Sequence, residues 1–206
     1  MGGNCKTGVE GKRLRTYYLI TAALVVISMV IQVASLTTGI YRFKNGAEGE
    51  LSILDGGISI LGQKWRFGFE VFSRVVGGIA LIGITLSLIL LVEGLASLRT
   101  GRGDPVDIIS YALTSSLILL FSGSLIYGFG YLLAKAMPGM IVVRNITTSA
   151  GLLVYPKPIM TPGLSYWMIR LYLPMLFPFI ATVSSVASYI LLLRRIDLCQ
   201  DRAIES

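Results

Sequence analysis

The sequence FEVFSRVVGGIALIGITLSLILLVEGL, residues 69–95, is apolar along almost its whole length and decides the fold class. As an α-helix, a segment of about 25 residues is about 37 Å long, which exceeds the hydrocarbon thickness of a bilayer, about 30 Å. Backbone amides inside lipid must bond within their own helix or within a closed barrel, and a continuous apolar run favours the helix. The segment is therefore predicted to be a transmembrane helix.

Three further stretches have the same character, at residues 17–41, 108–134 and 167–193. Of the 206 residues, 54% are hydrophobic and 14% are charged, whereas soluble domains carry about 25% charged residues. The first stretch is longer than the core of a signal peptide, which has about 7 to 15 residues, so we expect an uncleaved anchor. We predict an all-α membrane protein, a bundle of four transmembrane helices that forms a single domain over residues 1–206.

Lys and Arg residues in the short loops predict the orientation of the spans. The N-terminal segment, the loop at residues 96–107 and the C-terminal segment carry basic residues about twice as densely as the loops at residues 42–68 and 135–166. We therefore expect the protein in the cell membrane, with both termini in the cytoplasm and the latter two loops outside. Both cysteines, Cys5 and Cys199, then lie on the inner face, where thiols stay reduced.

The second outer loop contains an N-glycosylation acceptor pattern, Asn145 followed by Ile146 and Thr147. A glycan at Asn145 requires the outer location that the basic residues predict. Because a three-residue pattern also arises by chance, glycosylation of Asn145 is a hypothesis.

The first outer loop carries a hairpin signal at residues 51–61. The sequences LSIL and ISIL flank the turn Asp55-Gly56-Gly57, and glycine accepts the positive φ that tight hairpin turns require. We predict a short β-hairpin there, with a re-entrant or interfacial apolar segment as the alternative.

The second outer loop repeats this pattern more loosely, with strand-like residues 140–144 and 152–155 on either side of a polar run. An isolated hairpin is marginal in water, whereas hairpins on one face can pair into a sheet. We expect the two outer loops to form a small antiparallel β cap of three or four strands. Prolines are expected to end the strand pattern after it: Pro156, Pro158 and Pro162.

Four spans with two outer loops that carry sheet signals resemble the architecture of claudin-like tetraspan proteins. The signature of that family in the first outer loop, a tryptophan followed by Gly-Leu-Trp and a pair of cysteines, is absent, and Trp65 stands alone. The resemblance therefore implies the architecture and no functional residue.

Ionisable or amide groups within a span are candidate sites, because they are costly there unless paired or hydrated. Glu70 and Arg74 have the spacing of an i,i+4 ion pair at the outer end of the second span. Glu93, near the inner end, has Arg99 and the basic N-terminus as possible partners. Arg170 follows two interfacial aromatic residues and is expected to reach the head groups.

Gln32 is the amide deep in the first span, and we expect it to bridge to another helix, with a hydroxyl of the third span as one possible partner. Pro174 and Pro178 interrupt the fourth span and predict a helix kink, because each removes an amide donor. Broken helices can also mark transport sites.

Small residues four apart are frequent in the spans, and this spacing lets helices approach closely. They could hold the bundle together or bind partner subunits. The pairs are Ser73 and Gly77, Gly83 and Ser87, Ala112 and Ser116, Ser124 and Gly128, Ala181 and Ser185, and Ser184 and Ser188.

The chain lacks histidine, which excludes His-based zinc sites and Ser-His or Cys-His nucleophile pairs. Carboxylates are isolated, and no Cys-x-x-Cys pattern, P-loop or dinucleotide fingerprint occurs. We expect no enzyme and no catalytic, metal or cofactor site. The net charge of +7 is spread over short loops and favours contact with anionic head groups over nucleic acid. Depletion of labile side chains suggests a thermophilic, archaeal source.

Two functional hypotheses follow. The first is a non-catalytic tetraspan subunit or scaffold that packs against other membrane subunits, or against copies of itself, and makes protein contacts through its outer loops. The alternative is a small oligomeric channel or transporter that uses the kinked fourth helix, with Glu70, Arg74 and Arg170 clustered at its outer mouth.

Overall fold

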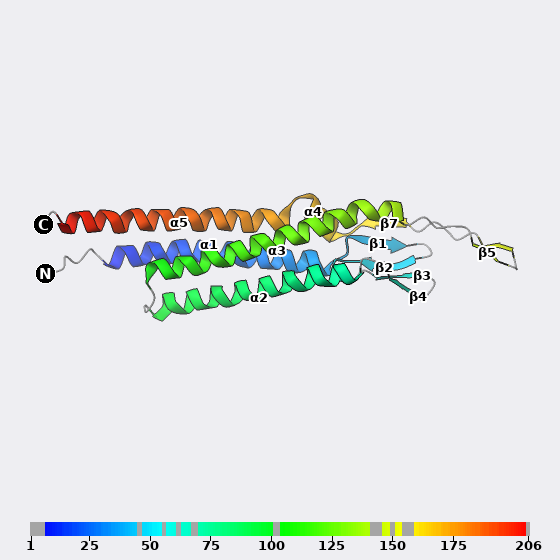
Figure 1. Ribbon diagram of the computed structural model, residues 1–206, viewed down its shortest axis with the longest axis horizontal. Helices are drawn as coiled ribbons and strands as arrows, with labels where there is room; N and C mark the ends of the chain where they lie inside the picture. Colours follow the sequence, from blue (N-terminus) through cyan, green and yellow to red (C-terminus); the bar gives the residue numbers. More distant parts are fainter. Residues whose placement is uncertain are drawn as a thin grey trace. The chain divides into compact units, whose positions relative to one another are not determined.

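The computed structural model describes residues 7–44, 47–54, 57–60, 63–66, 70–100, 104–140, 146–148, 151–153 and 159–204. Helices dominate this part of the chain (Figure 1). They are α1 (Thr7–Thr37), α2 (Glu70–Thr100), α3 (Pro105–Met140), α4 (Leu164–Arg170) and α5 (Leu173–Ile204). Four segments are long and apolar enough to cross a membrane, as predicted: Arg15–Thr37, Glu70–Thr100, Pro105–Ala136 and Leu173–Leu193.

Local sequence explains where the helices begin. Glu70 starts α2, where a carboxylate faces the positive end of the helix dipole. Asp104 caps α3, because its Oδ1 accepts a hydrogen bond from the Val106 amide at 3.4 Å, and Pro105 occupies the first helical position, where an amide donor is not needed.

The fourth apolar stretch forms two helices, α4 and α5, and the break between them lies at Leu171 and Tyr172. The prediction of a kink at Pro174 is therefore wrong in position. Pro174 is the second residue of α5, and proline is tolerated in the first turn. Pro178 does lie inside α5.

The chain divides into two compact units, and each long helix contributes a segment to both. The first unit comprises Met1–Met29, Ile82–Phe121 and Leu176–Ser206, and the second comprises Val30–Leu81 and Ser122–Met175.

Hydrogen bonds between helices hold the first unit together. The Tyr18 hydroxyl of α1 donates to the Leu91 carbonyl of α2 at 2.7 Å, and Gly94 leaves room for that ring. The hydroxyls of Ser87 and Ser115 donate to each other's backbone carbonyls at 3.0 and 2.9 Å, which joins α2 to α3. Buried hydroxyls thus connect helices where the surrounding lipid would provide little hydrophobic contrast.

The second unit contains a five-stranded antiparallel sheet with the strand order β4-β3-β2-β1-β7 (Figure 1). Its strands are β1 (Tyr41–Lys44), β2 (Ala47–Leu51), β3 (Gly57–Ile60), β4 (Gln63–Arg66) and β7 (Ile159–Pro162). Strands β1, β2 and β7 form a three-stranded core, since β1 pairs with β2 on one side and with β7 on the other. The expectation that both loops contribute to one small sheet is confirmed.

The pairing in the first loop differs in detail from the prediction. Strand β2 pairs with β3 through Ala47 opposite Ile60, so residues 52–54 are not the strand partner of residues 58–61. Leu51 and Ile53 are instead fully buried. Their apolar side chains pack inside the unit, and burial overrides the mirror symmetry of the sequence about the Asp-Gly-Gly turn.

The second loop forms a separate hairpin of β5 (Ile146–Thr148) and β6 (Gly151–Leu153). Strand β5 lies in the predicted polar run, whereas Leu152 and Leu153 of β6 lie in the predicted strand at residues 152–155. Met140, predicted to start a strand, ends α3. Residues 141–145 and 154–158, including Asn145, Pro156 and Pro158, lie outside the described residues. Pro162 ends β7 rather than excluding it, because an edge strand tolerates proline.

Candidate functional site

Three helices of the second unit meet around the carbonyl of Pro174. Pro178 has no amide hydrogen, so the carbonyl four residues before it in α5 lacks its helical donor. The Gln32 amide of α1 supplies one, donating from Nε2 to the Pro174 oxygen at 3.2 Å. A side chain on Gly123 of α3 would overlap this oxygen. We call this contact the Gln32 junction: Gln32, Gly123 and Pro174.

Helix α4 is fixed to the end of α1 by backbone and hydroxyl bonds. The Ser165 hydroxyl donates to the Ser35 carbonyl at 2.7 Å, and the Ser165 amide donates to the Gly39 carbonyl at 3.3 Å. The Gly163 amide donates to the Ile40 carbonyl at 2.8 Å, where any larger residue would overlap the Gly39 carbonyl. These bonds determine where the side chains of α4 lie.

The break after α4 depends on Tyr172, which has a φ of 58°, in the left-handed region. The residue follows the C-cap, Leu171, a position where helices commonly end with a left-handed residue, usually glycine. Its amide donates to the Ile169 carbonyl at 3.0 Å, and its ring lies 5.1 Å from that of Tyr127. A tyrosine in this conformation costs about 1–2 kcal/mol relative to glycine, so its contacts must offset that cost.

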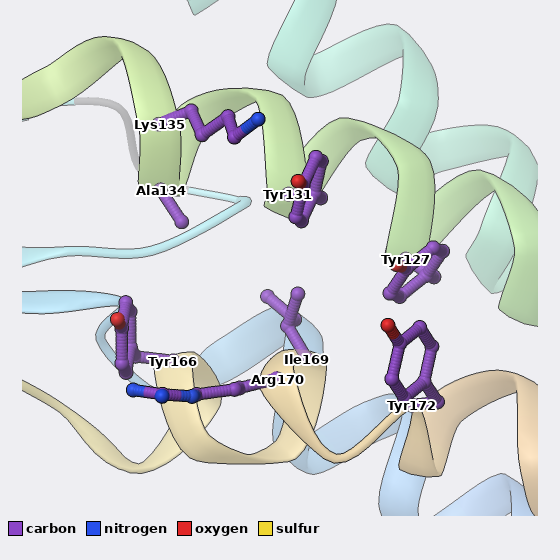
Figure 2. A pocket seen from close by; sticks show the side chains of 8 residues that line it. All are labelled: Tyr127, Tyr131, Ala134, Lys135, Tyr166, Ile169, Arg170 and Tyr172. Atoms are coloured by element: carbon purple, nitrogen blue, oxygen red, sulfur yellow. The ribbon is translucent and has the colours of Figure 1, made fainter.

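A cleft of about 240 Å³ opens between α3 and α4 (Figure 2). Its α3 wall consists of Tyr127, Tyr131, Ala134 and Lys135, and its other wall consists of Tyr166, Ile169, Arg170 and Tyr172. Figure 2 shows Ala134 and Ile169 pointing toward each other across the gap, with the tyrosines around them. We call it the tyrosine cleft.

One cation lies on each wall of the tyrosine cleft, and each rests on an aromatic ring. The Lys135 ammonium is 5.0 Å from the centre of the Tyr131 ring, and the Arg170 guanidinium carbon is 5.7 Å from that of Trp167. Among the described residues, no carboxylate lines the cleft. A cation over a ring is attracted by the π-electrons and keeps its N–H donors for other partners.

Tyr41 ties the sheet to α3 beside this cleft. Its hydroxyl donates to the Ala134 carbonyl at 2.8 Å, and its ring centre is 5.6 Å from that of Tyr166. Burial raises the pKa of Tyr41 above its ordinary value, and the neighbouring Tyr166 raises it further. The phenol therefore stays protonated and keeps this hydrogen bond at neutral pH.

The structure separates the charged residues that the sequence grouped together. Arg74 forms the expected ion pair with Glu70 on α2, and neither residue lines the cleft that contains Arg170. Arg170 lies over Trp167 and shares the cleft with Lys135. Glu93 is exposed on α2 and makes no ion pair within the described part of the chain.

Sequence reasoning missed the α3 wall of the cleft. Tyr127, Tyr131 and Lys135 are spaced four residues apart, which places them on one face of a helix. That spacing was visible in the sequence. The opposing position of Arg170 was not, because it depends on how α4 is bound to α1.

Most of the small-residue pairs are buried against other parts of this chain. Both members are buried in the pairs Ser73 and Gly77, Gly83 and Ser87, Ala112 and Ser116, and Ala181 and Ser185. Gly77, for example, leaves room for Leu54. Gly128 differs, because nothing lies within 4 Å of where its side chain would be. These four pairs therefore pack within the units, whereas Ser124 is exposed and Gly128 is half-buried.

Comparison of the chain with protein-family models, with curated proteins and with solved structures finds no match. Within the residues that the structure describes, no group of three metal-ligating side chains occurs.

Proposed function

We propose that the protein is a non-catalytic multi-pass subunit or scaffold of a membrane assembly, which binds partner subunits or further copies of itself through its sheet. The sheet and the tyrosine cleft face the outside of a cell membrane, and both termini are cytoplasmic. The density of Lys and Arg in the loops supports this orientation.

The sheet is the observation that carries the proposal. Strand β7 of the second loop pairs with β1 of the first loop over four residues, from Tyr41 opposite Pro162 to Lys44 opposite Ile159. The Tyr41 hydroxyl joins this pairing to α3 through the Ala134 carbonyl, and the Gly163 amide donates to the Ile40 carbonyl just before β1. A loop that only connects two spans does not need such a sheet, whereas a binding surface benefits from a rigid support.

Strand β7 is an edge of the sheet and offers backbone groups to another strand. Ile159 at its start is 54% exposed and adds an apolar contact. The edge of the sheet is therefore where we place the contact with a partner.

Photo-crosslinking in intact membranes tests this placement. A photoreactive amino acid at Ile159 should give protein adducts, and the same group at Val183, a 53% exposed residue of α5, should react mainly with lipid. Native mass measurement in mild detergent should show an oligomer or a complex. A strictly monomeric species without protein adducts at Ile159 would contradict the proposal.

One observation supports the alternative of a channel or transporter. The helix is interrupted between α4 and α5, and broken helices form the binding sites of many transporters. A flux assay distinguishes a transporter from a subunit. It measures the entry of ions and small solutes into liposomes that contain the purified protein. Transport that is lost in Arg170→Gln would favour the alternative, and no transport would favour the subunit.

A further inference from the structure

We propose that the tyrosine cleft binds a phosphate group, presented either by the head group of an anionic phospholipid or by a soluble phosphate ester. The proposal does not depend on the subunit function. It rests on the charges, the lining and the position of the cleft.

The positive charges of the cleft favour an anionic ligand. Lys135 and Arg170 lie on opposite walls, and none of the described residues places a carboxylate in the space between them. The carboxylates of Glu50 and Glu70 are engaged elsewhere, by Arg42 and Arg74. A ligand that reaches both walls must offer acceptor oxygens in more than one direction. A phosphate group does so with up to two negative charges, whereas a carboxylate offers one charge and two oxygens in a plane.

The lining fits a group that is polar at one end and apolar at the other. Tyrosine hydroxyls can donate to phosphate oxygens, while Ala134 and Ile169 point into the gap and form an apolar strip (Figure 2). The volume of about 240 Å³ corresponds to about eight water molecules, at about 30 Å³ each. That is sufficient for a phosphate and the first atoms of its ester.

The position along the chain fits a head group. Lys135 follows the uncharged run of residues 108–134 near the end of α3 (Pro105–Met140), so the cleft lies at an end of this apolar segment. Tyr166 and Trp167 of α4 are aromatic residues of the type enriched at membrane interfaces. Basic side chains at this depth attract anionic lipids.

Binding of defined phosphates to the full chain in maltoside detergent tests the proposal. The probes are dihexanoyl phosphatidic acid, glycerol 3-phosphate and uncharged dihexanoylglycerol. Trp167 provides the signal in a Trp65→Phe background, because Arg170 lies against its ring. We expect a saturable fluorescence change with phosphatidic acid. Lys135→Gln and Arg170→Gln should each weaken binding by about tenfold or more, since each removes a charge-assisted hydrogen bond.

Lys44→Gln is the matched control, because Lys44 is an exposed cation of the same unit that does not line the cleft. It should bind phosphatidic acid like the wild type. Lys135 and Arg170 are exposed, so their variants should keep the wild-type melting temperature.

The probes also identify the source of the phosphate. Equal affinity for glycerol 3-phosphate and phosphatidic acid would indicate a soluble ester, and binding of phosphatidic acid alone would indicate a lipid. The proposal is overturned if neither binds, if dihexanoylglycerol binds equally well, or if Lys44→Gln weakens binding as much as the cleft variants do.

Discussion

At the scale of single residues, the Gln32 junction shows how one proline determines the role of a distant amide. Pro178 leaves the Pro174 carbonyl without a helical donor, and Gln32 of α1 provides a substitute. Gly123 of α3 is the residue that allows this approach. The polar group in the first span is thus explained by the helix that it binds.

A double-mutant cycle tests this coupling. Gln32→Met removes the donor and should lower the free energy of unfolding by about 1 kcal/mol, a typical cost for a buried hydrogen bond. In a Pro178→Ala background the helix supplies its own amide donor, so the same change should cost clearly less. Denaturant titration in mixed micelles measures both. Thr37→Ala, whose hydroxyl bonds within α1 to Val33, is the control and should be additive with Pro178→Ala. An equal cost of Gln32→Met in both backgrounds would refute the coupling.

Two glycines of α3 should respond in opposite ways to alanine. Gly123→Ala places a methyl group against the Pro174 carbonyl and should cost about 1–3 kcal/mol, the range for overpacking. Gly128→Ala meets no atom within 4 Å and should gain up to about 1 kcal/mol from the higher helix propensity of alanine. The melting temperatures of both variants in detergent measure this difference. Similar melting temperatures for the two would show that the close contact at Gly123 does not exist.

At the scale of elements, hydropathy predicted the four long apolar helices because the length of an apolar run is a local property. The break between α4 and α5 was not visible, since the apolar pattern continues through Leu171 and Tyr172. The pairing of β1 with β7 was also hidden, because it joins residues about 120 positions apart in one sheet. The spacing of Tyr127, Tyr131 and Lys135 in the sequence could predict the α3 wall of the cleft. The sequence could not predict the opposing wall.

The left-handed backbone at Tyr172 gives a prediction for this break. Tyr172→Gly and Tyr172→Ala both lose the ring contact with Tyr127. Only the glycine variant also loses the backbone strain. Tyr172→Gly should therefore be about 1 kcal/mol more stable than Tyr172→Ala. The reverse order, which holds inside an ordinary helix, would mean that the chain continues as one helix through residue 172.

At the scale of the whole molecule, we propose that the chain crosses the membrane four times, so that the sheet and the two chain ends lie on opposite faces of the bilayer. In this topology, the partner contact at β7 and the phosphate site both lie on the outer face.

Labelling with a membrane-impermeant thiol reagent tests the topology most directly. In sealed, right-side-out vesicles, Cys5 and Cys199 should react only after the membrane is permeabilised. Lys44→Cys, on β1, in a chain without the two native cysteines, should react at once. Reaction of Cys5 and Cys199 on opposite sides, or protection of Lys44→Cys before permeabilisation, would contradict the account.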